Sequence, residues 1–75
     1  MRIILIRKDG YVYLKGKIPE YVTSFIRNKI KNENKIFDTE TYRYGIKENY
    51  FNSIKQSLLK DFSEIIEGDV RNLDI

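Results

Sequence analysis

The chain has 75 residues, no cysteine, no histidine and a formal net charge of +3. Such a chain forms one domain, residues 1–75, and buries only about 60% of its unfolded surface, which leaves little room for an enclosed active site. The missing side chains exclude disulfides, thiolate zinc sites and imidazole acid–base chemistry. We expect no enzymatic activity, no catalytic or metal-binding residues and no cofactor.

The first fifteen residues predict a β-hairpin. Two runs of strand-forming residues, 3–7 and 11–15, flank the pair Asp9-Gly10. An Asp-Gly pair favours a two-residue type I′ turn, because that turn requires positive φ angles. The predicted register sets Lys8 opposite Tyr11, Arg7 opposite Val12, Ile6 opposite Tyr13, Leu5 opposite Leu14, and Ile4 opposite Lys15.

The two faces of this hairpin differ in chemistry. One face carries aliphatic side chains typical of a core: Ile3, Leu5, Val12 and Leu14. The other, which we call the outer hairpin face, is apolar, aromatic and edged by cations: Ile4, Ile6, Tyr11 and Tyr13, with Lys8 and Lys15. Because side chains alternate along a strand, this second apolar face needs a cover, which could be a later segment, a second copy or a partner.

A helix is predicted over residues 19–32. Pro19 suits the first turn, since its missing N–H would have no partner there. An apolar stripe with spacings of three and four runs along it: Ile18, Val22, Phe25, Ile26 and Ile30. The polar residues 32–35 then predict a loop.

Two further elements complete the predicted chain. Alternating residues between Ile36 and Ile46 indicate a strand centred on residues 39–44, with Gly45 as its end or a bulge. A helical stripe from Phe51 to Ile65 indicates a helix over residues 47–68, with Gly68 as its stop. Residues 69–75 are expected to form a frayed tail or a short last strand.

The predicted order is therefore β-β-α-β-α. Such a chain packs as a small α+β domain, in which the N-terminal hairpin belongs to a mostly antiparallel sheet and two amphipathic helices cover one face. The apolar opening is too short and too soon interrupted by charge for a signal peptide or a membrane span. We expect a cytoplasmic protein, in its own cell or in a host cell, with no membrane partner.

Charge is divided unevenly along the chain. Residues 1–36 carry nine basic and three acidic side chains, a balance of +6, and residues 37–75 carry five basic and eight acidic ones, a balance of −3. If the fold keeps this separation, one surface attracts polyanions. The alternative is that the charges serve solubility alone.

The segment Ile36-Phe37-Asp38-Thr39-Glu40-Thr41 resembles the first motif of the proofreading-type exonucleases. Asp and Glu two apart on a strand project from one face and can reach one divalent ion. Those enzymes need further acidic residues on later elements, and Asp61 is the only remote candidate. A solvated strand face is the simpler interpretation of Asp38 and Glu40.

A second resemblance is to the small N-terminal accessory domains of phage-type superfamily-two DNA helicases. The segment Gly16-Lys17-Ile18-Pro19 before an amphipathic helix, and Tyr42-Arg43-Tyr44-Gly45, carry it. The resemblance implies an accessory module that contacts nucleic acid, although no helicase motor is present in this chain.

The candidate partner-binding residues combine aromatic and basic side chains: Lys8, Tyr11, Tyr13, Lys15, Tyr42, Arg43 and Tyr44. We expect them to bind a protein partner, as in a phage or mobile-element inhibitor or adaptor, because Tyr and Arg dominate interface hot spots. The alternative is a nucleic-acid-binding accessory module that contacts a single strand or the backbone, with bases stacked on the tyrosines. A homodimer through the outer hairpin face is also open, and so is a plain edge role for these tyrosines.

Overall fold

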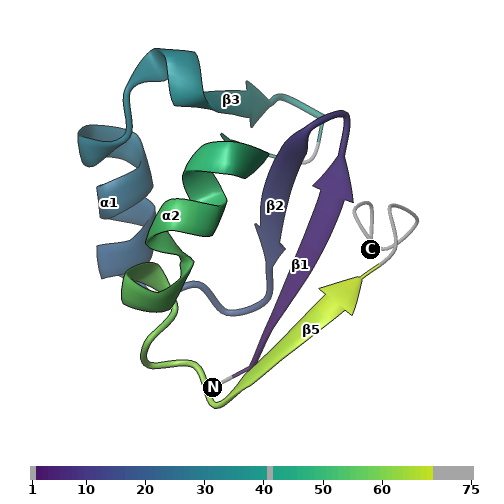
Figure 1. The fold of residues 1–75 in the computed structure, drawn as a ribbon, viewed down its shortest axis with the longest axis vertical. Helices are drawn as coiled ribbons and strands as arrows, with labels where there is room; N and C mark the ends of the chain where they lie inside the picture. The colour runs from purple at the N-terminus through teal and green to yellow at the C-terminus, as the bar shows by residue number, and fades with distance from the viewer. Residues whose placement is uncertain (1, 41, 69–75) are drawn as a thin grey trace.

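The structure, a computed structural model, describes residues 2–40 and 42–68. It is an α+β domain in which two helices accompany one five-stranded mixed sheet (Figure 1). In chain order the elements are β1 (Arg2–Lys8), β2 (Tyr11–Lys15), α1 (Glu20–Lys29), the short 3-10 helix η1 (Asn32–Asn34), β3 (Lys35–Asp38), β4 (Arg43–Lys47), α2 (Glu48–Leu58) and β5 (Glu64–Gly68). The predicted α+β class is confirmed, and the predicted order lacked two strands.

The sheet has the strand order β3-β4-β2-β1-β5. β1 pairs antiparallel with β2, β2 with β4, and β4 with β3, whereas β5 pairs parallel with β1. The N-terminal hairpin therefore occupies the middle of the sheet, and β3 and β5 are its two edges.

The β1–β2 hairpin follows the prediction closely. Asp9 and Gly10 both have positive φ, 53° and 84°, as a two-residue type I′ turn requires. All the predicted pairs occur, from Lys8 opposite Tyr11 to Ile4 opposite Lys15. The turn residues alone were enough to set the register.

Residues 36–46 contain a second hairpin instead of the single strand that we predicted. β3 and β4 pair antiparallel, and directly after β3 the backbone N–H of Glu40 donates to Asp38 Oδ1 at 3.0 Å. A turn held by an aspartate side chain needs neither glycine nor proline. The alternation of residues therefore continues across this turn, and the sequence pattern does not mark it. Gly45 lies inside β4, opposite Tyr13, and does not end the strand.

The prediction of one helix over residues 47–68 is wrong beyond Leu58, where α2 ends. The spacing of Leu58, Phe62 and Ile65 fits a helix, but Ile65 and Ile66 are β-branched residues that suit a strand. They lie in β5, and Gly68 ends that strand instead of stopping a helix. Residues 69–75, for which we expected a tail or a short strand, lie outside the described residues.

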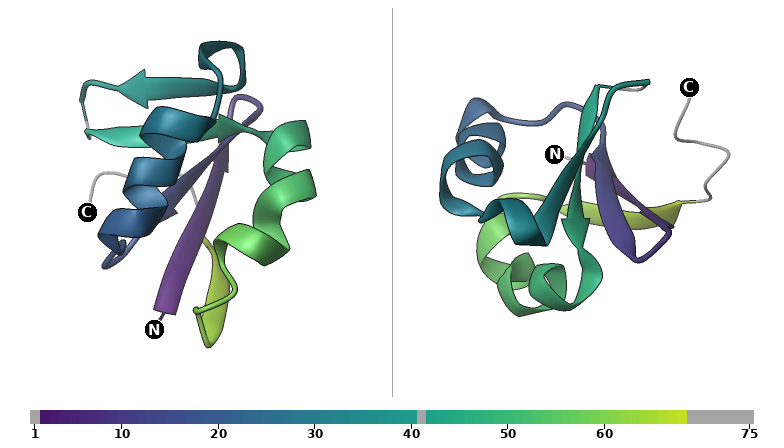
Figure 2. Two further views of the ribbon diagram at one scale, coloured as in Figure 1. Left: turned by 90° about the vertical axis from the view of Figure 1, so that its left-hand side faces the viewer. Right: turned by 90° about the horizontal axis from the view of Figure 1, so that it is seen from above.

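The main core lies between the sheet and both helices, which Figure 2 shows on the same side of β1 and β2. Its buried members are Ile3, Leu5, Val12, Leu14, Val22, Ile26, Ile30, Ile46, Phe51, Leu58, Leu59 and Phe62. α1 is shorter than the predicted residues 19–32, since Pro19 caps its start and Ile30 is already extended. The predicted stripe of α1 nevertheless supplies this core, with Phe25 half-buried at its margin.

The opposite face of the sheet has a smaller apolar cluster, with Ile6 fully buried and Tyr13 only 7% exposed. Two glycines flank it. A Cβ on Gly45 would lie 2.8 Å from the ring of Tyr13, and a Cβ on Gly68 would lie 2.5 Å from Ile4. Because Gly45 and Gly68 lack side chains, those of β1 and β2 can spread sideways over β4 and β5.

Candidate functional site

The seven candidate binding residues lie in two regions. Lys8, Tyr11, Tyr13 and Lys15 are on the outer hairpin face of β1 and β2, and Tyr42, Arg43 and Tyr44 are at the start of β4 and just before it. The sheet order places β4 beside β2. However, Tyr44 packs against the main core on the helix side, and Tyr13 belongs to the cluster on the opposite face. The seven residues therefore do not share one face.

On the outer hairpin face the aromatic side chains are recessed. Burial is the main cause that raises the pKa of Tyr13, with a further contribution from the charge of Asp38. Tyr11 is half-buried beside it, and Lys8 is exposed. This region therefore offers a cation at its margin and little aromatic surface.

The β3–β4 hairpin holds a more accessible group of rings, Phe37, Tyr42 and Tyr44, which we call the aromatic cluster. The ring of Phe37 contacts that of Tyr44 edge-on at 4.9 Å between centroids, and that of Tyr42 at 6.3 Å. Tyr42 is 79% exposed and Phe37 43% exposed. Edge-to-face contacts at these distances stabilise a ring arrangement without hiding it.

Tyr42 has an unusual backbone conformation, with φ at 55°. Positive φ is uncommon outside glycine, and a bulky residue there costs on the order of 1–3 kcal/mol. The exposed ring of Tyr42 gains little burial to offset that cost. Strain of this kind is often found at functional positions.

Lys35 lies between the aromatic cluster and the carboxyl end of α1. Its Nζ donates to the carbonyl oxygens of Ile26 at 3.0 Å and Arg27 at 2.7 Å, and lies 5.7 Å from the ring centroid of Tyr44. A cation at the carboxyl end of a helix satisfies its last carbonyl groups and its dipole. Lys35 therefore fixes the end of α1 against β3 and places positive charge beside the cluster.

A cleft of about 320 Å³ adjoins the aromatic cluster between α1 and β4. Leu14, Ile18 and Ile26 contribute its apolar side, and Tyr42, Arg43 and Tyr44 line the side of the hairpin. The rings that protrude from the hairpin therefore border a hollow that an inserted side chain could occupy.

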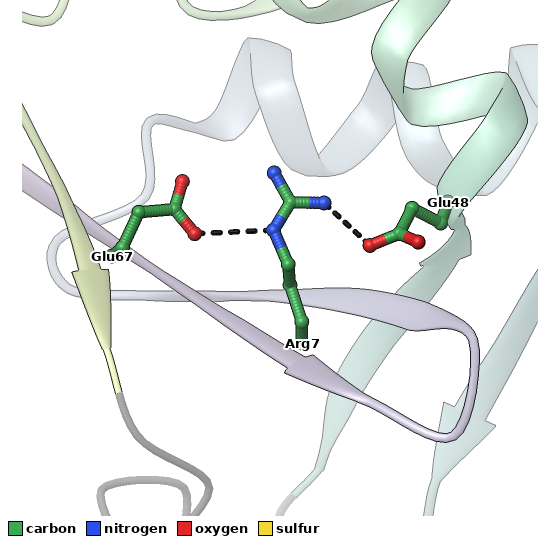
Figure 3. A network of polar contacts seen from close by, with 3 residues as sticks. All are labelled: Arg7, Glu48 and Glu67. Atoms are coloured by element: carbon green, nitrogen blue, oxygen red, sulfur yellow. Dashed lines mark hydrogen bonds and ion pairs between the residues drawn. The ribbon is translucent and has the colours of Figure 1, made fainter.

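The division of charge along the sequence is partly cancelled by the fold. Arg7 Nη1 lies 2.6 Å from Glu48 and its Nε 3.1 Å from Glu67 (Figure 3), and Arg2 lies 2.8 Å from Glu64. The hydrogen bonds that Arg7 donates, first to Glu67 and then to Glu48, raise the pKa of its guanidinium. These acidic side chains of the second half thus neutralise basic ones of the first.

Comparison with known proteins adds no relative. No protein-family model matches the chain, and no curated protein or solved structure matches it significantly.

The acidic pair of the exonuclease-like segment does not share a strand. Asp38 ends β3 and Glu40 lies in the following turn. Within residues 2–40 and 42–68, no group of three or more Asp, Glu, His or Cys side chains is placed to hold a metal ion. No helix in the described part of the chain has the length and apolar character needed to cross a membrane.

The sequence prediction did not include Phe37 and Lys35 among the site residues. A single strand over residues 36–46 would have set Phe37 seven residues away from Tyr44 along one ribbon, whereas the hairpin pairs them directly. The available signal was the polar run from Asp38 to Thr41, which is typical of a turn.

Proposed function

We propose that this chain is a non-enzymatic protein-binding module, an inhibitor or adaptor, whose contact surface is the aromatic cluster together with Arg43. The observation that carries the proposal is the exposed ring of Tyr42 held at positive φ on a hairpin beside the sheet edge. Interface hot spots are rich in Tyr and Arg set close to a pocket, and the neighbouring cleft supplies such a pocket.

The aliphatic character of β3 favours a protein partner. Ile36 is 44% exposed on one face of β3, and Phe37 is 43% exposed on the other. An exposed isoleucine contributes to apolar burial against a protein surface. It offers a nucleobase neither a stacking plane nor a hydrogen bond.

A nucleic-acid partner is the second candidate because cations gather near the cluster. The exposed residues Arg27, Lys29 and Lys31 belong to the end of α1 or follow it directly, and Lys35 ties that end to β3. Stacking of bases on Tyr42 with phosphates held by these cations is the mode that single-strand binders use.

The test is differential capture from a lysate with and without nuclease. Tyr42→Asn removes the ring and keeps a residue that tolerates positive φ, so the fold should be unaffected and capture should be lost. Tyr21→Asn is the matched control, since Tyr21 is also exposed, at 47%, but lies on α1.

The proposal requires the same protein to be captured by the unaltered chain and the Tyr21 variant, and not by the Tyr42 variant, whether or not nuclease is added. Loss of capture on nuclease treatment would select the nucleic-acid candidate. In that case, affinity should fall with salt at a log–log slope of roughly 0.7–0.9 for each phosphate contact. Capture that survives Tyr42→Asn would contradict both candidates.

A further inference from the structure

β3 is an edge strand of the sheet and carries exposed apolar side chains. Among the described strands it pairs with β4 alone. Ile36 and Phe37 occupy its middle and are both exposed. Edge strands of this kind pair readily with another chain unless charge, proline or a bulge prevents it.

The hydrogen-bonding pattern identifies which backbone groups of β3 face outward. In a two-residue hairpin the pair next to the turn, Lys8 with Tyr11, is hydrogen-bonded, and bonded pairs then alternate along the ladder. When this alternation is followed across the paired strands, the backbone groups of Tyr13 bond to β1, those of Gly45 to β3, and those of Ile36 to β4. The N–H and C=O groups of Phe37, one residue further along, therefore turn outward.

The available outward backbone groups of β3 also determine the register in which another strand can pair with it. The N–H of Lys35, the residue that follows η1, is already donated to the carbonyl oxygen of Asn32, the first residue of η1. Phe37 can still exchange both of its bonds with an outward residue of another strand. The simplest residue that offers the same pair of groups is Phe37 of a second, antiparallel copy.

The charges at the ends of β3 do not oppose pairing with such a copy. Lys35 begins the strand and Asp38 ends it. With Phe37 opposite Phe37, Lys35 lies opposite Thr39 and Asp38 opposite Ile36, so no two like charges face each other. At the opposite edge, Glu64 and Glu67 sit near both ends of β5, so two copies of β5 would set like charges together.

We infer that two copies of this chain associate through β3, antiparallel, with Phe37 opposite Phe37 on the two-fold axis. Directly opposite residues share one face of a sheet, so the two aromatic clusters lie side by side on the same face of a continuous ten-stranded sheet. Four-residue strands bury less than a standard interface, so the dimer is weak and depends on concentration. The inference does not depend on the identity of any other partner.

Sedimentation equilibrium of the purified chain, from low micromolar to millimolar concentration, tests the dimer. The unaltered chain should shift from monomer to dimer across this series. Phe37→Lys should remain monomeric, because it sets two ammonium groups opposite each other on the axis. Ile65→Lys is the matched control on the other edge, where Ile65 is 40% exposed, and it should dimerise as the unaltered chain does.

Amide hydrogen exchange tests the register without any substitution. The Phe37 N–H should exchange more slowly as concentration rises, and the amides of β5 should not change. A chain that is monomeric throughout the series, a Phe37 variant that dimerises normally, an Ile65 variant that does not, or Phe37 exchange independent of concentration would each overturn the inference. None of these results bears on whether Tyr42 is needed to capture a partner from a lysate. The dimer and the proposed function can therefore fail separately.

Discussion

The two edge strands of the sheet, β3 and β5, differ in the charged residues that flank their apolar centres. In β5 the sequence Glu-Ile-Ile-Glu sets two acidic residues around its apolar pair, and Glu64 and Glu67 bind arginines of the neighbouring strand β1. In β3 the sequence Lys-Ile-Phe-Asp has one charge of each sign, and both are engaged within the fold, Lys35 with α1 and Asp38 with the turn. The exposed centre of β3 therefore lies between charges of opposite sign, whereas the apolar pair of β5 lies between charges of the same sign.

The two edge strands should therefore differ in how readily they pair with another chain. Like charges beside an edge oppose pairing with other chains, whereas exposed apolar and aromatic side chains favour it. The strained Tyr42 and the cleft beside it are also on the β3 side. The contrast supports placing the partner contact at β3–β4 and a structural role at β5.

The largest expected effect compares two isoleucines on the same face of the sheet. Ile6 is fully buried next to β5, and Ile36 is 44% exposed on β3. Ile6→Ala should destabilise the fold by about 2–5 kcal/mol, because it leaves a cavity. Ile36→Ala should cost less than about 1 kcal/mol. If chemical denaturation showed equal losses of unfolding free energy for the two variants, Ile36 would be as well packed as Ile6, and β3 would not be an exposed edge.

Removing the arginine that holds β5 should have a smaller effect. Arg7→Met breaks the ion pairs with Glu48 and Glu67. The three side chains are between 36% and 56% exposed, so the loss should be about 1 kcal/mol or less. It should shrink further in high salt. Lys29→Met, at an exposed site of α1, is the control, and a loss of equal size there would remove the special role of Arg7.

Replacing the strained tyrosine should stabilise the protein. Tyr42→Gly puts the residue most tolerant of positive φ at 55° and removes little buried area. Thermal denaturation should report a gain of about 0.5–1 kcal/mol, reduced by the greater freedom of glycine in the unfolded chain. Partner capture should be lost in the same variant. A stability decrease would mean that the ring contributes to the fold.

The buried tyrosine of the outer hairpin face predicts a loss of stability at alkaline pH. Burial raises the pKa of Tyr13 above its usual 10.0, so above about pH 10 the unfolded chain releases a proton that the folded chain retains. Stability is therefore fully present below that pH and declines above it. Tyr13→Phe should make the alkaline decline shallower in denaturation curves. An unchanged decline would show that Tyr13 is accessible to water.

The sequence was most informative where local chemistry decides the structure. Asp9-Gly10 specified a turn, and the turn specified every pair of the first hairpin. The apolar stripe of α1 identified its buried side. In these segments the relevant contacts lie within about a dozen residues.

The rest depended on contacts that a pattern does not reveal. The apolar residues in segment 58–65 have helical spacing, and only pairing with β1 makes Ile65 and Ile66 part of a strand. The sequence between β3 and β4 contains no glycine or proline, so the sequence pattern did not reveal the hairpin that pairs Phe37 with Tyr44. The burial of Tyr13 requires Gly45 on the adjacent strand, which sequence alone could not place there.

The central claim is that the β3–β4 hairpin is the contact surface, and chemical-shift mapping of the backbone amides tests it most directly. The captured partner would be titrated into the isotope-labelled chain. We expect the largest shifts at Phe37, Tyr42, Arg43 and Tyr44, with β5 and the turn at Asp9-Gly10 little changed. Shifts concentrated on β5, or on Tyr11 and Lys8 of the outer hairpin face, would contradict the account.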